Sequence, residues 1–130
     1  MGSVTENEES SELHLKTTFY IDDSYQYKIV YFDMPGKERH HKYVHKYVNG
    51  STAIIYLFDL NKRQSFEHIE QWINECEQGG EAPIKILIGN KADLLQNKKP
   101  LVNKVEAMNL ARKYGMEYFE TSSIGEASIV

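Results

Sequence analysis

The chain has 130 residues, 41% of them hydrophobic and 26% charged, which is typical of one soluble globular domain with a single core. Its formal net charge of −4 argues against a dedicated nucleic-acid-binding protein, so no nucleic-acid partner is expected. The single cysteine, Cys76, excludes a disulfide framework, and no apolar run approaches membrane-spanning length, so a reducing, cytoplasmic setting is predicted.

The N-terminal third begins with a polar segment and continues as two strands. Residues 1–11 are acidic and lack periodicity, which predicts a flexible tail ahead of a domain at 12–130. From Leu13 to Ile21 apolar residues alternate, which indicates a strand with one buried face. A turn signal precedes a second run from Tyr25 to Phe32, so an antiparallel hairpin is predicted.

A helix is predicted from Glu38 to Tyr47, because Asn49-Gly50 is a good stop signal. Its histidines His41 and His45 stand four residues apart and could share one face. No Cys, Asp or Glu completes an obvious zinc ligand set nearby, so a solvated basic helix face is favoured over a metal site. No metal site is therefore predicted.

The middle of the chain reads as a strand followed by a helix. Ser51 to Leu60 is predicted to be a central parallel strand, because its apolar residues occupy both faces. Ser65 is predicted to cap a helix that runs to Gln78. The inner stripe of this helix is predicted to comprise Phe66, Ile69, Trp72, Ile73 and Cys76.

An apolar run at 84–89 is short, rich in β-branched residues and follows a proline, so it is predicted to be a buried strand. Asn90-Lys91-Ala92-Asp93 then falls at its carboxyl end, where open α/β sheets bind ligands. The carboxylate of Asp93 can accept two N–H hydrogen bonds from one ligand. Asn90 can donate a hydrogen bond, and the aliphatic stem of Lys91 can lie along a flat ring.

The last elements are a helix and a short strand. Asn103 with Glu106 predicts a capped helix through Tyr114 that ends at Gly115. A short strand is predicted at 116–119, and a polar loop follows it.

Three motifs in this order resemble those of Rab-like small GTPases. Asn90–Asp93 resembles the guanine-reading motif, Asp33–Glu38 resembles the Asp-x-x-Gly-Gln-Glu switch II segment, and Glu120–Ser123 resembles the Glu-Thr-Ser-Ala loop. Asp59-Leu60-Asn61 with the following helix resembles the Rab branch in particular. The resemblance implies guanine-nucleotide contacts at Asn90, Lys91, Asp93, Thr121, Ser122 and Ser123, and switch II-like positions at Asp33, Gly36 and Lys37.

The resemblance also implies an α/β fold of the P-loop NTPase type, and the chain departs from the family pattern. Lys37 stands where the family has the Gln that orients the attacking water, and a lysine cannot accept a hydrogen bond, so no catalytic residue and no GTP hydrolysis are predicted. No G-x-x-x-x-G-K-[ST] occurs. Because charge-assisted hydrogen bonds contribute about 1.5–3 kcal/mol each, GTP or GDP is expected to bind weakly, without Mg²⁺.

The sequence also shows no counterpart of the family's first strand and last helix. In the family the first strand lies between the strands predicted here at 51–59 and 84–89, so its absence implies a gap in the sheet, unless those two strands pair directly. Its absence would leave an apolar sheet face bare, so a protein partner that covers this face or supplies a strand is expected.

Two functions remain open. One is a pseudo-GTPase domain that acts as a protein-binding or structural subunit without GTP turnover. The other is a GTP- or GDP-binding small GTPase whose P-loop half is not in this chain; an incomplete gene model would also explain the pattern. No lipidation cysteine ends the chain, so no direct membrane anchor is expected, and the Rab resemblance suggests a cytoskeletal or ciliary setting.

Overall fold

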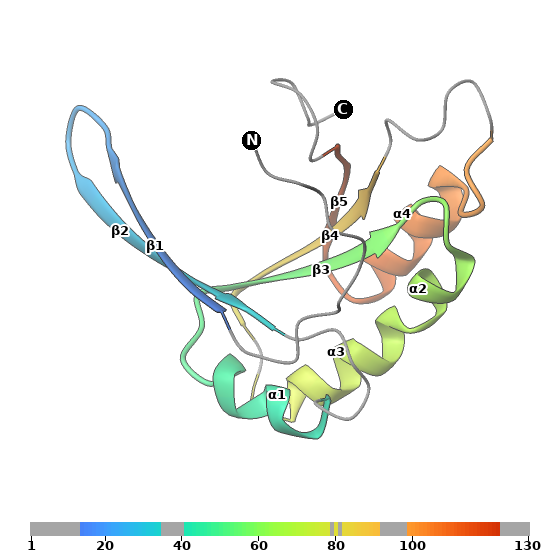
Figure 1. The fold of residues 1–130 in the computed structure, drawn as a ribbon, viewed down its shortest axis with the longest axis horizontal. Helices are drawn as coiled ribbons and strands as arrows, with labels where there is room; N and C mark the ends of the chain where they lie inside the picture. The colour runs from blue at the N-terminus through green and yellow to red at the C-terminus, as the bar shows by residue number, and fades with distance from the viewer. Residues whose placement is uncertain (1–13, 35–40, 79, 81, 92–98, 123–130) are drawn as a thin grey trace.

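The structure is a computed structural model that describes residues 14–34, 41–78, 80, 82–91 and 99–122; the predicted tail at 1–11 lies outside them. Figure 1 shows the arrangement of the elements. In chain order these are β1 (His14–Ile21), β2 (Gln26–Asp33), α1 (His41–Val48), β3 (Ala53–Asp59), α2 (Arg63–Glu67), α3 (Ile69–Glu77), β4 (Ile84–Asn90), α4 (Lys104–Lys113) and β5 (Glu117–Glu120).

The predicted hairpin is confirmed. β1 and β2 pair antiparallel, from His14 opposite Asp33 to Ile21 opposite Gln26. Asp22 closes the turn, because its Oδ1 accepts hydrogen bonds from the backbone N–H groups of the second and third residues that follow, at 2.8 and 2.7 Å. The prediction that β1 has one buried face is wrong, because seven of its eight residues are exposed and Ile21 is 70% exposed.

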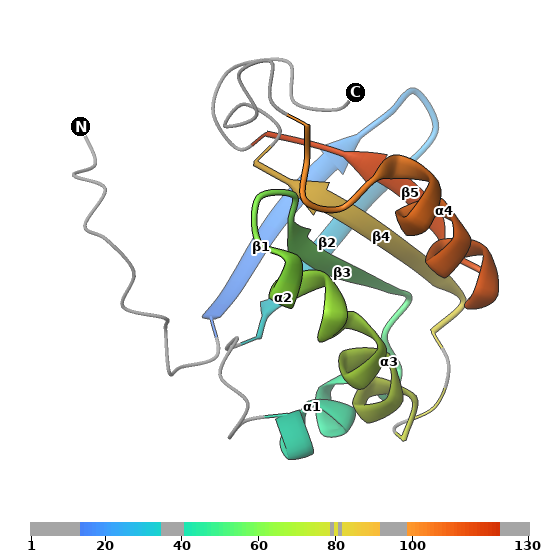
Figure 2. The same cartoon turned by 90° about the vertical axis from the view of Figure 1, so that its right-hand side faces the viewer.

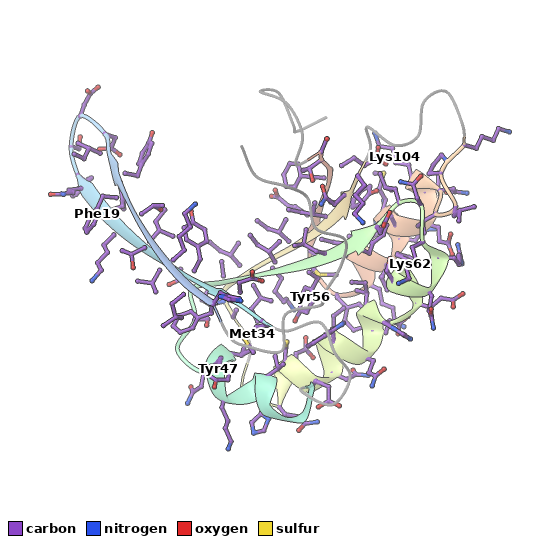
Figure 3. All side chains as sticks on the ribbon, viewed as in Figure 1. Phe19, Met34, Tyr47, Tyr56, Lys62 and Lys104 are labelled. Carbon is purple, nitrogen blue, oxygen red and sulfur yellow. The ribbon has the colours of Figure 1, made fainter. Side chains whose placement is uncertain are left out.

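The hairpin contacts the rest of the molecule at one end. The rings of Phe32 on β2 and Tyr47 on α1 lie 6.5 Å apart, and Met34 packs against the core. Figure 1 shows the two strands projecting away from the helices, and Figure 3 shows Phe19 far along this ribbon. The alternation in β1 therefore indicates an amphipathic ribbon. Within the described part of the chain, the apolar side chains of this ribbon are exposed.

The second sheet has the strand order β3-β4-β5, and all its strands are parallel. Of the two arrangements left open for the missing first strand, the structure has direct pairing: β3 and β4 are neighbours, from Ala53 opposite Ile84 to Asp59 opposite Asn90. The free edges within the described sheets are those of β3 and β5, and of β1 and β2. Helices around a parallel sheet confirm the predicted α/β class and fit an incomplete small-GTPase fold.

The helices differ from the prediction at one capping residue. The helix predicted to begin at Ser65 is two helices, α2 and α3, and α2 begins at Arg63. The Ser65 hydroxyl instead donates to the Lys62 carbonyl at 2.7 Å and accepts from the Asp59 N–H at 2.9 Å. In α4 the predicted cap is confirmed, because the Asn103 side chain accepts from the backbone N–H three residues later at 3.0 Å.

The helices cover one face of the parallel sheet, as Figures 1 and 2 show together. Side chains on that face are buried, and Figure 3 shows Tyr56 between β3 and the helices. The predicted stripe is confirmed, with Trp72 half-buried and its other members buried; burial also raises the pKa of the Cys76 thiol, which fits a core residue. The buried cluster is Val44, Val48, Tyr56, Phe58, Leu60, Phe66, Ile69, Ile73, Cys76, Leu87, Val102, Ala107, Leu110, Ala111 and Met116.

The opposite face of the same sheet, which we call the bare face, carries the alternate residues of the strands. Ile55 and Ile84 are each 50% exposed, and Leu57 is 59% exposed. The β4 residues opposite Ile55 and Leu57, which are Ile86 and Ile88, are half-buried. The described structure therefore has two apolar sheet faces and helices on one of them.

Candidate functional site

The candidate site lies at the carboxyl edge of the parallel sheet. Because β3, β4 and β5 run in the same direction, their carboxyl ends meet at one edge, where α/β sheets bind ligands. The register places Asp59 beside Asn90. The backbone N–H of Thr121 extends the ladder by donating to the carbonyl of Gly89 at 2.9 Å. Segments far apart in the sequence thus form one polar edge.

The side chains of Asn90 and Thr121 are joined across this edge. The Thr121 hydroxyl donates to Asn90 Oδ1 at 3.0 Å, and both residues are half-buried. An amide whose oxygen is held in this way has a fixed plane, so its NH₂ group is presented in a defined direction. The pair therefore provides an oriented hydrogen-bond donor at the end of β4.

Lys91 has an unusual backbone conformation. Its φ is 63°, in the left-handed region that residues with a Cβ rarely adopt. Its carbonyl accepts a hydrogen bond from Asn61 Nδ2 at 3.1 Å, and its ammonium lies 3.0 Å from Asp59 Oδ2. The side chain of Lys91 is therefore held by the last residue of β3, and its backbone by the loop that follows that strand.

The Asp59 carboxylate links the two loops. Its second oxygen, Oδ1, accepts the Asn61 backbone N–H at 2.8 Å, and its side chain is 20% exposed. Burial by itself would raise the pKa of Asp59, but the Asn61 N–H and the Lys91 ammonium more than offset this, so the pKa lies below its usual value. Asp59 is therefore ionised at neutral pH and held on both oxygens.

The structure brings together some of the residues predicted from the sequence. Asn90, Lys91, Thr121 and Ser122 lie at this edge or directly beside it. Asp33 ends β2 in the other sheet and is exposed. Four further predicted positions lie outside the described residues: Gly36, Lys37, Asp93 and Ser123.

Sequence reasoning missed Asp59 and Asn61 as site residues. Asp59-Leu60-Asn61 contributed to the family resemblance, but neither polar side chain was assigned a role. The available signal was their position: Asp59 lies at the end of a predicted parallel strand and Asn61 directly after it, and parallel strands place such residues at a shared edge.

The edge is suited to binding a flat polar ring. It combines an oriented amide, a hydroxyl and an ammonium on a four-carbon stem. Within the described ranges, no three His, Cys, Asp or Glu side chains cluster as metal ligands would. Nor does any helix among those residues have the length and apolarity to cross a bilayer.

Comparison with known proteins shows the family. Residues 5–129 match the model of the Ras family. The chain is 32% identical over 108 residues to the Ras-related protein Rab-15 of Bos taurus, covering 82% of this chain and 50% of that protein. It is 37% identical over 94 residues to the Ras-related protein Rab-27B of Rattus norvegicus, covering 71% of this chain and 42% of that protein. It therefore spans about half the length of the curated relatives it matches. The match of the family model over nearly the whole chain, together with these identities, shows that the chain belongs to the Ras family and is a Rab-like small-GTPase domain.

Proposed function

We propose that this Ras-family chain is a protein-binding domain: a partner covers the bare face or supplies a strand at the free edge of β3, and the chain does not turn over GTP. The observation that carries the proposal is the exposure of Ile55, Leu57 and Ile84 on one continuous sheet face. Burying apolar surface contributes about 25 cal/mol per Å², so such a face favours association.

The free edge of β3 adds a second means of binding. In the described sheet, β3 has β4 on one side and no strand on the other. An extended segment can pair with such an edge through backbone hydrogen bonds, while its alternate side chains lie beside Ile55 and Leu57 and contact them on the same face. Both means of binding use the same strand, so a single partner segment can satisfy them together.

The absence of turnover follows from chemistry in the sequence. Lys37 occupies the position of the water-orienting Gln in the family motif, and an ammonium donates hydrogen bonds but cannot accept one. An attacking water would therefore lack the acceptor that aligns it.

Two matched leucines test the protein-binding role. Leu57 on the bare face is 59% exposed, and Leu101 ahead of α4 is 60% exposed. We expect Leu57→Glu to abolish the association of the full chain with its native partner, measured by co-purification and by loss of hydrogen-exchange protection over 53–59. Leu101→Glu should bind like the wild type. A cooperative, soluble wild-type monomer with no protected strand in its native complexes would contradict the proposal.

A second candidate function is binding of a guanine nucleotide, and the joined side chains of Asn90 and Thr121 specifically favour it. We expect Asn90→Ala to weaken GDP binding, measured by isothermal titration, because the oriented amide is lost. Asn109→Ala, at an exposed position on α4, is the control and should leave binding unchanged. If the natively isolated chain releases no guanine nucleotide on denaturation and does not bind GDP, this second function fails and the first stands alone.

A further inference from the structure

The contacts of Lys91 form a closed set. Its carbonyl accepts from the Asn61 side chain, its ammonium pairs with Asp59 Oδ2, and Asp59 Oδ1 accepts the Asn61 N–H. Each of the three residues contacts the other two. Two of the interactions connect the end of β3 and its following loop with Lys91, the residue after β4, and the third joins Asp59 to Asn61.

These contacts explain the backbone of Lys91. A left-handed conformation is unfavourable for a residue with a Cβ, and it persists where surrounding contacts hold it. The Asn61–Lys91 hydrogen bond fixes the carbonyl that this conformation turns toward β3. The conformation is therefore maintained by residues distant in the sequence.

The same contacts fix the direction of the side chain. Lys91 follows β4, whereas the carboxylate that holds its ammonium belongs to Asp59, the last residue of β3. The four-carbon stem therefore extends from one strand end to the neighbouring strand end. The Lys91 side chain remains 47% exposed, so part of that stem is accessible from solvent.

We propose that Asp59 and Asn61 are positioning residues that hold Lys91 as a preformed platform for the flat face of a guanine base. This inference rests on the second candidate function, guanine-nucleotide binding, and adds two residues that act through Lys91. Holding the stem before the base arrives spares the ordering of a long, flexible side chain on binding. The ammonium is neutralised within the site, so the stem rather than the charge serves the base.

The first test measures the Asp59 contact without any ligand. Reductive methylation of the full chain, quantified at each lysine by mass spectrometry, reports how available each ammonium is. Asp59→Asn should raise the methylation rate of Lys91 by roughly threefold to tenfold, because the charged partner is lost. The rate at Lys113 should not change. An unchanged rate at Lys91 would overturn the proposal.

A second ion pair in the same chain provides the matched control. The Lys113 ammonium lies 3.1 Å from Glu70 Oε2, far from the site in the sequence. Glu70→Gln should raise the methylation rate of Lys113 and leave that of Lys91 unchanged. Each variant thus serves as the control of the other, and any general loosening of the fold would raise both rates in both variants.

The second test measures binding of guanosine, which lacks phosphates and so reports on the base alone. Asp59→Asn and Asn61→Ala should each weaken guanosine binding by about threefold to tenfold, whereas Glu70→Gln should not weaken it. Asp59→Glu, which keeps the carboxylate, should recover part of the affinity. Equal guanosine affinity in Asp59→Asn and the wild type would overturn the platform role.

The two tests separate the two possible failures. If the wild type does not bind guanosine while Asp59→Asn still exposes Lys91 to methylation, the base-binding function fails and the platform role fails with it. If the wild type binds guanosine but Lys91 is methylated at the same rate in both chains, the base-binding function stands and the positioning role of Asp59 is wrong.

Discussion

The two faces of the parallel sheet are built from the same strands and are similarly apolar, yet they have different surroundings. On β3, Tyr56 and Phe58 are buried beneath the helices, whereas Ile55 and Leu57, which alternate with them along the strand, are half or more exposed. The difference shows that an apolar pattern along a strand predicts which side chains are suited to burial. It does not identify the segment that covers them. In the proposed protein-binding function, the bare face is therefore the part of the molecule that needs another polypeptide segment most.

The largest expected difference between the faces comes from two leucines on neighbouring strands. Leu87 is fully buried and Leu57 is 59% exposed. Leu87→Ala should lower the free energy of unfolding by about 2–5 kcal/mol, because it leaves a cavity in the core. Leu57→Ala should lower it by about 0.5 kcal/mol or less. Urea denaturation of both variants measures this; equal losses would mean that the bare face is covered in solution.

A smaller effect is expected at Gly89, on the helix-covered face. A Cβ at this position would lie 2.8 Å from Leu60 Cδ2 and 2.8 Å from the Tyr118 hydroxyl. Gly89→Ala should therefore lower the free energy of unfolding by about 1–3 kcal/mol through overpacking.

Gly115 provides the contrast for that substitution. Its Cβ would meet no atom within 4 Å, but its φ is +67°. Gly115→Ala should cost about 1 kcal/mol through backbone strain alone. Thermal unfolding of the two variants would compare them, and a larger loss at Gly115 would contradict the close packing at Gly89.

The smallest expected effect lies at the polar edge where the two faces meet. The pKa of Asp59 in the folded chain is below its ordinary value of 3.8. Its contribution to stability is therefore complete above that value and is lost as the pH falls through the lower, folded pKa. At pH 7, Asp59→Asn should lower the free energy of unfolding by about 1 kcal/mol or less.

Acid should reduce the difference between these two chains, because the Asp59 carboxylate is increasingly protonated as the pH falls below 3.8 and so loses its advantage over the uncharged Asn. Urea midpoints measured at pH 7 and pH 3 for the wild type and Asp59→Asn test this. A difference that grows in acid would show that the carboxylate is not stabilised in the folded state.

Local sequence patterns predicted most elements of the fold. The apolar runs predicted β3 and β4, and Asn103 predicted the start of α4, because strands and helix caps depend mainly on residues close in the sequence. Ser65 was misassigned because its hydroxyl is used instead to connect the helix to the end of β3, and tertiary contacts override capping propensity.

The order of the strands and the contacts of Lys91 were not predictable in the same way. Direct pairing of β3 with β4 depends on the whole topology, which alternation along a strand does not encode. The partners of Lys91, Asp59 and Asn61, are about thirty residues away, and nothing local marks them as partners. The predictions at Asn90, Lys91 and Thr121 came from a motif and not from a contact.

The separation along the sequence between paired residues differs between the two sheets, and this has a consequence for folding. In the hairpin, Ile21 pairs with Gln26 across a turn closed by Asp22, so its contacts form between residues close in the chain. In the parallel sheet, Ala53 pairs with Ile84, so about thirty residues must be ordered before the first contact forms. Because loop closure slows such contacts, the hairpin is expected to form early in folding and the polar edge late. The contacts of Asp59 and Asn61 with Lys91 are therefore expected to form late in folding, after β3 and β4 have paired.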